Sequence, residues 1–373
     1  MVNNQVKMAL QELFDLSGIK INGDRPYDIH IHRDDLYARI LKGGISAVGE
    51  SYMDGWWDCE ALDQLVDKVM RVKYEDYIKK NWRLILHTLR SKIINLQKIS
   101  RAYEVGEKHY DIGNSFYKAM LDKRMLYTSG YWKNADNLEA AQEAKLDLVC
   151  KKINLQHGMS VLDLGCGWGS FAKYAAEKYG ASVTGVTVSK EQVELGRQMC
   201  AGLPVEIKLD DYRNVTGKYD RVISIGIMEH VGHKNYRTYM TMVERTLKDD
   251  GIAFIHTIGN NITTTTTNPW IHKYIFPNGM IPSIAQIGKA MEKLFVMEDW
   301  HNFGPDYDKT LMAWYDNFER AWPEFKDQYG KRFYRMWRFY LLSCAGMFRS
   351  RRIQLWQIVM TKPGVEQPEC RFS

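Results

Sequence analysis

The chain has 373 residues, 45% of them hydrophobic, and a formal net charge of +6. This length exceeds the usual size of one domain, and the small excess of Lys and Arg suits phosphates or anionic lipids but not nucleic acid. The six cysteines lie far apart and form no CxxC pair. Such spacing favours a reducing cytoplasm over a secreted protein built on disulfides.

The segment 1–18 interrupts its apolar positions with Gln, Glu and Asp. We therefore expect neither a signal peptide nor a transmembrane helix there, and no later apolar run reaches spanning length. Residues 1–76 mix short helical patterns with loops and predict a small, mainly helical N-terminal domain. Any contact with a membrane is expected to be made from its surface.

The segment 77–103 has apolar residues at helical spacing and contains no acidic residue. A basic amphipathic helix of this kind is typical of a segment that lies on an anionic bilayer. The alternative is a helix that packs on the next domain and keeps its basic face in water. The basic residues of this linker segment are Lys79, Lys80, Arg83, Arg90, Lys92, Lys98 and Arg101.

Residues 104–373 predict a larger domain in which strands and helices alternate. This alternation indicates an α/β fold with a mostly parallel, doubly wound sheet. The region 274–373 is less regular and rich in aromatic residues. The predicted strands are 160–164, 181–188, 205–209, 221–225 and 252–257, and the clearest helices are 168–179 and 190–200.

A glycine turn follows the first of these strands. Asp163 is followed two residues later by the G-x-G-x-G sequence of Gly165, Gly167 and Gly169. Glycines at the carboxyl end of a strand permit a tight turn and let a ligand approach the backbone. The pattern resembles the first motif of class I methyltransferases, where the acid and the glycines hold the amino-acid end of S-adenosylmethionine. Glycines that serve only packing are the alternative.

Two further segments lie where that fold would need them. Thr187, Ser189 and Gln192 follow the second strand, where ribose hydroxyls are held, and Asp211 and Tyr212 follow the third, where adenine lies. An ordinary class I enzyme has an acid at the end of its second strand, and this chain has none. Ser189 and Gln192 are the polar residues that could replace it.

Several separated motifs remain: Tyr110–Asn114, Tyr127–Trp132, Gly226–Val231, His256–Gly259, Lys273–Gly279 and the pair Asp306 and Asp308. Together they resemble the cyclopropane-fatty-acyl-phospholipid synthase family. The match covers nearly the whole chain and includes the segment 50–57, which the related mycolic acid cyclopropane synthases lack. It also assigns Tyr110, Tyr127 and Thr128 to the cofactor.

The resemblance implies a reaction and its catalytic residues. The cis double bond of an unsaturated acyl chain in a membrane phospholipid attacks the methyl group of S-adenosylmethionine, and loss of a proton from the new methyl closes a cyclopropane ring. A bound bicarbonate ion is the base. The family pattern assigns its binding to Glu229, His256 and Tyr307, with the backbone of Ile258 and Ser129. Cys344 matches another family cysteine near the site, and we expect it to pack rather than to react.

The positions of these residues agree with that assignment. Glu229 follows the fourth predicted strand and His256 ends the fifth, so both are expected at the carboxyl edge of the sheet, where ligands bind. A histidine that only satisfies a buried neighbour is the alternative reading. Nearby aromatic residues could bury an acyl chain or could be ordinary core. The family commonly has Cys where this chain has Ser129, so we expect that position to act through its backbone N–H.

The sequence also limits the metals, partners and alternative functions to be expected. His230 and His233 have metal-ligand spacing but no evident third ligand, and we predict no metal. The resemblance suggests a homodimer, associated peripherally with the inner face of the membrane. Two other functions stay open: methylation of another lipid without ring closure, and a non-catalytic membrane-binding protein. The retained Glu229, His256 and Tyr307 favour a deprotonation step and hence the ring.

Overall fold

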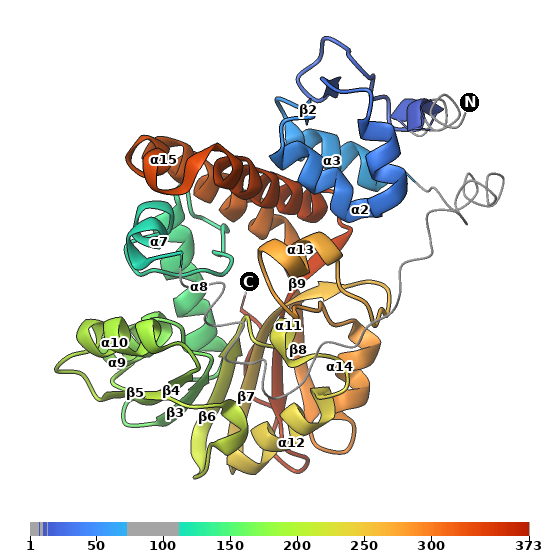
Figure 1. The fold of residues 1–373 in the computed structure, drawn as a ribbon. Helices are drawn as coiled ribbons and strands as arrows, with labels where there is room; N and C mark the ends of the chain where they lie inside the picture. Colours follow the sequence, from blue (N-terminus) through green and yellow to red (C-terminus); the bar gives the residue numbers. More distant parts are fainter. Residues whose placement is uncertain (1–6, 8–9, 13, 73–111, 373) are drawn as a thin grey trace. The chain divides into compact units, whose positions relative to one another are not determined.

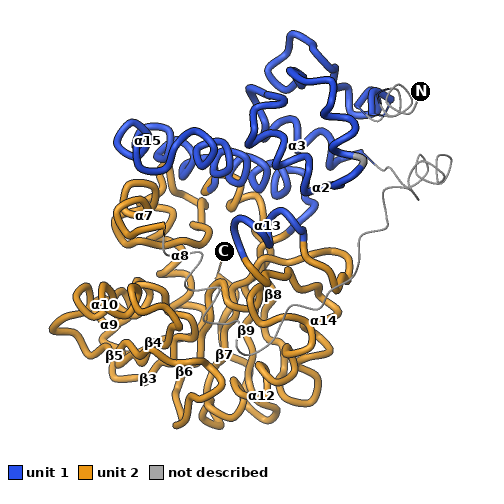
Figure 2. The backbone as a smooth tube through the Cα atoms, in the orientation of Figure 1, with its two compact units in different colours: residues 1–96, 268–276, 311–353 blue, residues 97–267, 277–310, 354–373 orange. Residues whose placement is uncertain are grey.

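The computed structural model describes residues 7, 10–12, 14–72 and 112–372 (Figure 1). The predicted basic segment 77–103 and Tyr110 lie outside this part of the chain. Contacts divide the molecule into two compact units (Figure 2). The predicted boundaries at 76 and 103 stay predictions, because each unit combines segments that are distant in sequence. The first unit contains residues 1–96, 268–276 and 311–353, and the second contains 97–267, 277–310 and 354–373.

The first unit is mainly helical. Its hydrophobic core includes Tyr52, Trp57, Leu62 and Leu342, so the N-terminal residues pack on a helix that comes from near the end of the chain. Burial of these large side chains is the main stabilising term of such a small unit. Its elements are β1 (His30–Ile31), α2 (Leu36–Met53), β2 (Trp57–Asp58), α3 (Leu62–Arg71), α13 (Pro269–Tyr274) and most of α15 (Gly304–Arg349).

The second unit contains a seven-stranded sheet. Its order is β5-β4-β3-β6-β7-β9-β8. The pairs of β4 with β5, β3 with β4, β3 with β6 and β6 with β7 are parallel, whereas β8 and β9 pair antiparallel. The strands are β3 (Ser160–Leu164), β4 (Ser182–Thr187), β5 (Val205–Leu209), β6 (Tyr219–Ile225), β7 (Leu247–Asn260), β8 (Val296–Asn302) and β9 (Ile353–Thr361).

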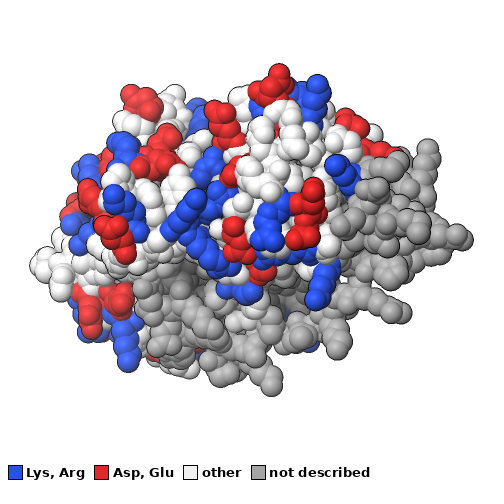
Figure 3. Space-filling view, turned by 45° about the horizontal axis from the view of Figure 1, so that its top comes forward, with Lys and Arg blue, Asp and Glu red and all other residues white. Residues whose placement is uncertain are grey.

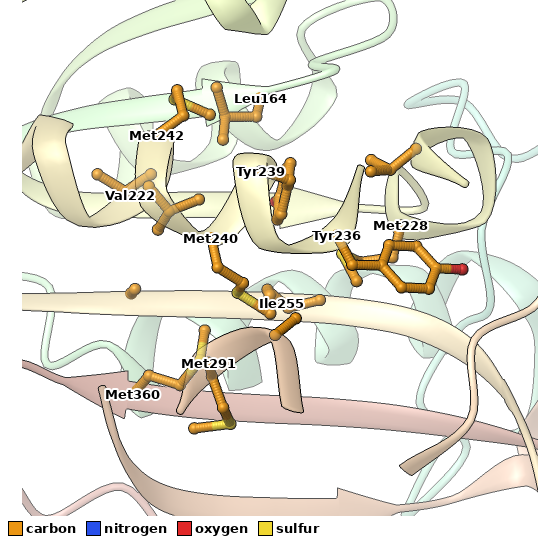
Figure 4. Packing of buried hydrophobic residues seen from close by; sticks show 14 of the residues in the cluster. Leu164, Val222, Met228, Tyr236, Tyr239, Met240, Met242, Ile255, Met291 and Met360 are labelled. Atoms are coloured by element: carbon orange, nitrogen blue, oxygen red, sulfur yellow. The ribbon is translucent and has the colours of Figure 1, made fainter. Parts of the chain in front are cut away.

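Helices cover both faces of this sheet, and the strands alternate their side chains between the two covers. On β3, for example, Val161 joins the hydrophobic cluster that includes residues of α8 and α9, while Leu162 joins the cluster with α12 and α14. Figure 4 shows Met240 of α12 beside Ile255 of β7 in the second cluster. The helices of this unit are α7 (Asn114–Met120), α8 (Leu138–Lys152), α9 (Ser170–Tyr179), α10 (Lys190–Met199), α11 (Met228–Val231), α12 (Tyr236–Thr246) and α14 (Ile284–Met291).

The predicted fold class is confirmed, since strands and helices alternate around a mostly parallel sheet. The C-terminal region is more regular than its sequence indicated: α15 has 46 residues. Pro323 and Gly330 interrupt its helical pattern, and Gly330 has a non-helical φ of 74°. Among the described helices, none is long and apolar enough to cross a membrane.

Candidate active site

The glycine turn after β3 has a backbone conformation that favours glycine. Gly165, Gly167 and Gly169 have φ values of 69°, 56° and 78°, which disfavour any other residue. A Cβ at Gly165 would collide with the side chain of Ile227, whereas a Cβ at Gly167 would meet nothing within 4 Å. The backbone at Gly167 is therefore open to a ligand.

Asp163, just before this turn, is a buried acid with an unpaired oxygen. It is 2% exposed, and its Oδ2 has no hydrogen-bond partner in the described part of the chain. Burial raises the pKa of Asp163 to about 7, and the nearby ammonium of Lys145 opposes this shift. An unpaired carboxylate oxygen beside an open glycine turn fits a ligand with a cationic amino group.

The polar residues after β4 form a closed network. Thr187 Oγ1 donates to Gln192 Oε1 at 2.6 Å, and the backbone N–H of Ser189 donates to Thr187 Oγ1 at 3.3 Å. Ser189 Oγ accepts the N–H of Gln192 and so caps α10. Ser189 and Gln192 thus lie together, at the position where an acid was expected from other class I enzymes.

Asp211, which follows β5, is hydrogen-bonded to the nearby Arg213. Its Oδ1 accepts hydrogen bonds from the Arg213 N–H at 3.0 Å and from Arg213 Nε at 2.7 Å. Burial opposes ionisation of Asp211, but these bonds outweigh it and lower its pKa. The adjacent Tyr212 packs edgewise on Tyr239, with ring centroids 5.5 Å apart.

The turn from Tyr127 to Ser129 lies beside the end of β6, because a Cβ at Gly226 would be 3.1 Å from Thr128 Cγ2. Two residues of α8 hold this turn from the protein interior. Gln142 Nε2 donates to the Thr128 carbonyl at 2.7 Å, and Lys145 Nζ donates to Thr128 Oγ1 at 2.9 Å. The turn is therefore fixed by side chains that the sequence did not single out.

The Ser129 hydroxyl forms its hydrogen bond inside the protein. It is fully buried and donates to the Gly130 carbonyl at 2.8 Å. Thr310 Oγ1 accepts the Gly130 N–H at 3.0 Å and the Trp132 Nε1–H at 2.9 Å. These contacts tie the turn to the first residues of α15. They agree with the expectation that Ser129 offers its backbone, and not its hydroxyl, to a ligand.

Glu229 is the second residue of the short helix α11, which follows β6. Its Oε1 accepts the N–H of Ile258 at 2.6 Å, while its Oε2 is shielded from solvent and has no partner among the described residues. Burial raises the pKa of Glu229 to about 7. The Ile258 N–H therefore holds Glu229. The contacts of Glu229 and of the Ile258 backbone with a bound bicarbonate stay predictions.

His256 lies at the end of the parallel part of β7 and is 1% exposed. Its Nδ1 is 3.5 Å from Gln357 Nε2, and its Nε2 has no partner within the described ranges. Burial lowers the pKa of His256 well below its usual value, so the ring is neutral at physiological pH. Glu229 and His256 thus place two unpaired polar atoms at the carboxyl edge of adjacent strands.

The other predicted catalytic residues divide between the two units. Tyr307 is buried in the first turns of α15, next to Asp306, whose Oδ2 accepts the Trp132 N–H at 2.7 Å. Cys344 belongs to the first unit, and burial raises the pKa of its thiol to about 12. A thiol with that pKa is not a nucleophile at neutral pH. No group of three metal-ligating side chains occurs in the part of the chain that the structure describes.

Comparisons with known proteins place this geometry in a family. The family model "Mycolic acid cyclopropane synthetase" matches residues 97–358. The chain is 51% identical to "Cyclopropane-fatty-acyl-phospholipid synthase" of Escherichia coli K12 over 95% of this chain and 93% of the relative. It is 36% identical to "Probable fatty acid methyltransferase" of Pseudomonas putida over 68% of each chain.

Solved structures agree with the sequence relatives. Mycolic acid cyclopropane synthase CmaA1, complexed with SAH and CTAB, matches with a TM-score of 0.66 and 30% identity, over 70% of this chain and 98% of that one. The cyclopropane synthase MmaA2 from Mycobacterium tuberculosis matches with a TM-score of 0.66 and 28% identity, over 72% and 100%. The chain therefore belongs to the mycolic acid cyclopropane synthetase family, with the fold of class I S-adenosylmethionine-dependent methyltransferases.

Proposed function

We propose that this protein transfers a methylene group from S-adenosylmethionine to the cis double bond of an unsaturated acyl chain in a membrane phospholipid and so forms a cyclopropane ring. The observation that carries the proposal is the 51% identity, over nearly the full length, to an enzyme of that name. The unpaired polar atoms at the sheet edge support it, because such a reaction needs a base in a site shielded from water.

The cosubstrate would bind over the glycine turn. Asp163 would accept a hydrogen bond from the amino group, and the backbone at Gly167 would approach the amino-acid end. Thr187, Ser189 and Gln192 form the polar surface available to the ribose, and Tyr212 offers an aromatic face to adenine. S-Adenosylmethionine supplies the electrophilic methyl group, and the protein's task is to hold that methyl against the double bond.

Glu229 and His256 fit a small oxyanion. Because Gln357 Nε2 lies against Nδ1 of His256, the ring proton is assigned to Nε2, which then donates a hydrogen bond. Glu229, with a pKa of about 7 raised by burial, exchanges a proton readily near neutrality. Bicarbonate held by these groups, Tyr307 and the backbone at Ser129 would supply the base that removes the proton.

The lipid is expected to be reached from a membrane surface. The net charge of +6 and the acid-free segment 77–103 support binding to an anionic bilayer at its cytoplasmic face. On the face drawn in Figure 3, Lys and Arg are interspersed with Asp and Glu. Binding to anionic vesicles should therefore weaken as salt rises. Binding that salt leaves unchanged would count against this role. The active form is proposed to be a homodimer.

A second candidate is transfer of a methyl group that stops before the ring closes. The 36% identity to a probable fatty acid methyltransferase favours it. The test is to incubate the purified protein with S-adenosylmethionine and vesicles of monounsaturated phospholipid, then to analyse the acyl chains by mass spectrometry and NMR. A gain of one CH2 with cyclopropane protons supports the ring-forming proposal, the same gain as a branched methyl group supports the second candidate, and no gain despite cofactor binding would reject both lipid reactions.

A further inference from the structure

Helix α8 has an unusual buried stripe. Leu138, Gln142, Lys145, Val149 and Lys152 follow one another at intervals of four and three residues, so they share one face of the helix. All five are buried, and Gln142, Lys145 and Lys152 are completely so. A buried ammonium is costly unless it has polar partners. The two lysines must therefore be held by groups in the domain interior.

The face of the sheet beneath this stripe carries the site residues. In a strand, side chains two residues apart point to the same face of the sheet. Asp163 therefore shares a face with Val161 on β3, and His256 shares a face with Phe254 on β7. Val161 and Phe254 both belong to the hydrophobic cluster that contains residues of α8. Asp163 and His256 therefore face α8 from the sheet, and the Lys145 ammonium interacts electrostatically with both.

Lys145 also holds the substrate-side turn, through its 2.9 Å bond to Thr128 Oγ1. Gln142, one turn earlier on α8, fixes the carbonyl of the same residue. Asp122, whose carboxylate accepts the N–H groups of Arg124 and Leu126, is the second acid near the ammonium. One buried cation thus connects the 127–129 turn with the strand that carries Asp163.

We propose that Lys145 is a positioning residue of this methyl-transfer site: it fixes Thr128 and keeps the carboxylate of Asp163 ready to receive the cationic amino group of the cosubstrate. The proposal rests on the proposed function, in which Asp163 contacts S-adenosylmethionine. Lys145 touches neither substrate in this account. It acts through Thr128 and through Asp163.

The titratable groups around Lys145 and Asp163 determine the effect expected when the charge of Lys145 is removed. Burial lowers the pKa of His256 and raises the pKa of Cys166, Cys200 and Tyr239, so these groups are neutral near pH 7. Asp122 is the remaining acid, and Lys145 is the cation that opposes the raised pKa of Asp163. The titratable groups that interact with Lys145 or Asp163 are Asp122, His256, Cys166, Cys200 and Tyr239.

The test is calorimetry of S-adenosylhomocysteine binding from pH 6 to 9 in buffers of different ionisation enthalpy. The wild-type protein is expected to release a proton on binding near pH 7, because the ligand's ammonium favours the Asp163 carboxylate. In K145M the release should move to higher pH, and Kd at pH 7.5 should rise by about threefold to thirtyfold, since a nearby cation shifts an acid by one to a few pKa units. The difference should shrink toward pH 9.

K152M is the matched control, because Lys152 is also buried on the stripe of α8 but pairs with Asp299 at 2.5 Å. Asp299 keeps Arg371 at 2.7 Å, so the protein should still fold, with wild-type Kd and proton release. K145Q keeps a donor for Thr128 but not the charge, and it should behave as K145M. If neither Lys145 variant folds, the wild-type profile decides: release of a full proton from Asp163 even at pH 8 would mean that Lys145 does not keep the carboxylate ionised, and it overturns the proposal.

The outcomes separate this inference from the proposed function. A K145M or K145Q protein that binds with the wild-type pH profile overturns the inference alone. A wild-type protein that binds no S-adenosylhomocysteine at any pH overturns the proposed function and, with it, the inference. A shifted profile in the Lys145 variants and an unshifted profile in K152M support it.

Discussion

Two regions at the carboxyl edge of the same sheet differ in how their polar groups are satisfied. After β4 and β5, Gln192 and Asp211 bind neighbouring side chains of the protein. After β6 and on β7, Glu229 and His256 each keep a buried atom without a partner among the described residues. Leaving a buried polar atom unpaired costs free energy. We therefore expect the second region to pair these atoms with a ligand, and the first to be a preformed surface.

Asp163 lies on β3, the strand between these two regions. Its unpaired Oδ2 resembles the atoms of the second region more than the closed networks beside it. We therefore expect Glu229, His256 and Asp163 to interact with ligands directly, and Gln192 and Asp211 to shape the site around them.

The largest effect is expected from Glu229→Gln. The amide keeps an oxygen for the Ile258 N–H but can no longer exchange a proton, so kcat should fall by about a hundredfold to ten-thousandfold. Binding of S-adenosylhomocysteine should be unchanged. The rate of CH2 gain in monounsaturated lipid measures the effect, with the exposed Glu292→Gln as control. A kcat near the wild-type value would remove Glu229 from the chemistry.

The next effect separates Asp163 from Asp211. Asp163→Asn removes a charge-assisted hydrogen bond and should raise the Kd of S-adenosylhomocysteine by about tenfold to a hundredfold. Asp211→Asn loses a carboxylate that is already committed to Arg213, so its effect on Kd should be smaller and its effect on thermal stability larger. Isothermal titration and thermal unfolding of both variants measure this. Equal losses of affinity would break the comparison between the two regions.

A pH-dependent effect on stability is expected from the same glutamate. Burial raises the pKa of Glu229 from 4.5 to about 7, so between these values the folded state binds more protons than the unfolded state, and stability falls as pH rises. Glu229→Gln should stabilise the protein by about 3 kcal/mol at pH 8, because the neutral amide escapes this cost. The gain should fall below about 1 kcal/mol at pH 5. Urea unfolding at both pH values measures it, and an equal difference at both would contradict the raised pKa.

The smallest effect is expected from Ser129→Ala. The hydroxyl donates within the turn and not to a ligand, so the variant should lose about 1 kcal/mol of stability and keep most of its activity. Near-complete loss of CH2 transfer in a folded variant would mean that the hydroxyl, and not the backbone, serves the reaction.

The sequence predicted the strands better than the residues that support them. The bounds 160–164 and 205–209 were predicted as the structure has them, because the first is mostly apolar and the second alternates apolar with charged residues, and both patterns indicate a strand. Glu229 was expected after the fourth predicted strand and His256 at the end of the fifth; the structure has Glu229 in α11 after β6, and His256 inside β7 where its pairing with β6 ends. The long helix α15 was missed, because Pro323 and Gly330 break its pattern.

Lys145, Thr310 and Gln357 could not be found from the sequence alone. Lysine on a helix usually lies in water, and only the packing of α8 on the sheet reveals that Lys145 is buried. Thr310 and Gln357 meet Gly130 and His256 across large sequence separations. Such contacts depend on tertiary structure, which local patterns do not encode. The helical spacing of Gln142, Lys145 and Lys152 would by itself have indicated an exposed polar face, whereas all three are buried.

The fate of the transferred carbon tests the proposed formation of a cyclopropane ring most directly. Monounsaturated phospholipid vesicles are incubated with the protein and S-adenosylmethionine labelled with carbon-13 in its methyl group, and the lipid is examined by NMR. We predict that the label appears as the methylene of a cyclopropane ring. A label that appears as a branched methyl group would retain the cofactor site but contradict the removal of a proton from the new methyl group by a base held at Glu229 and His256.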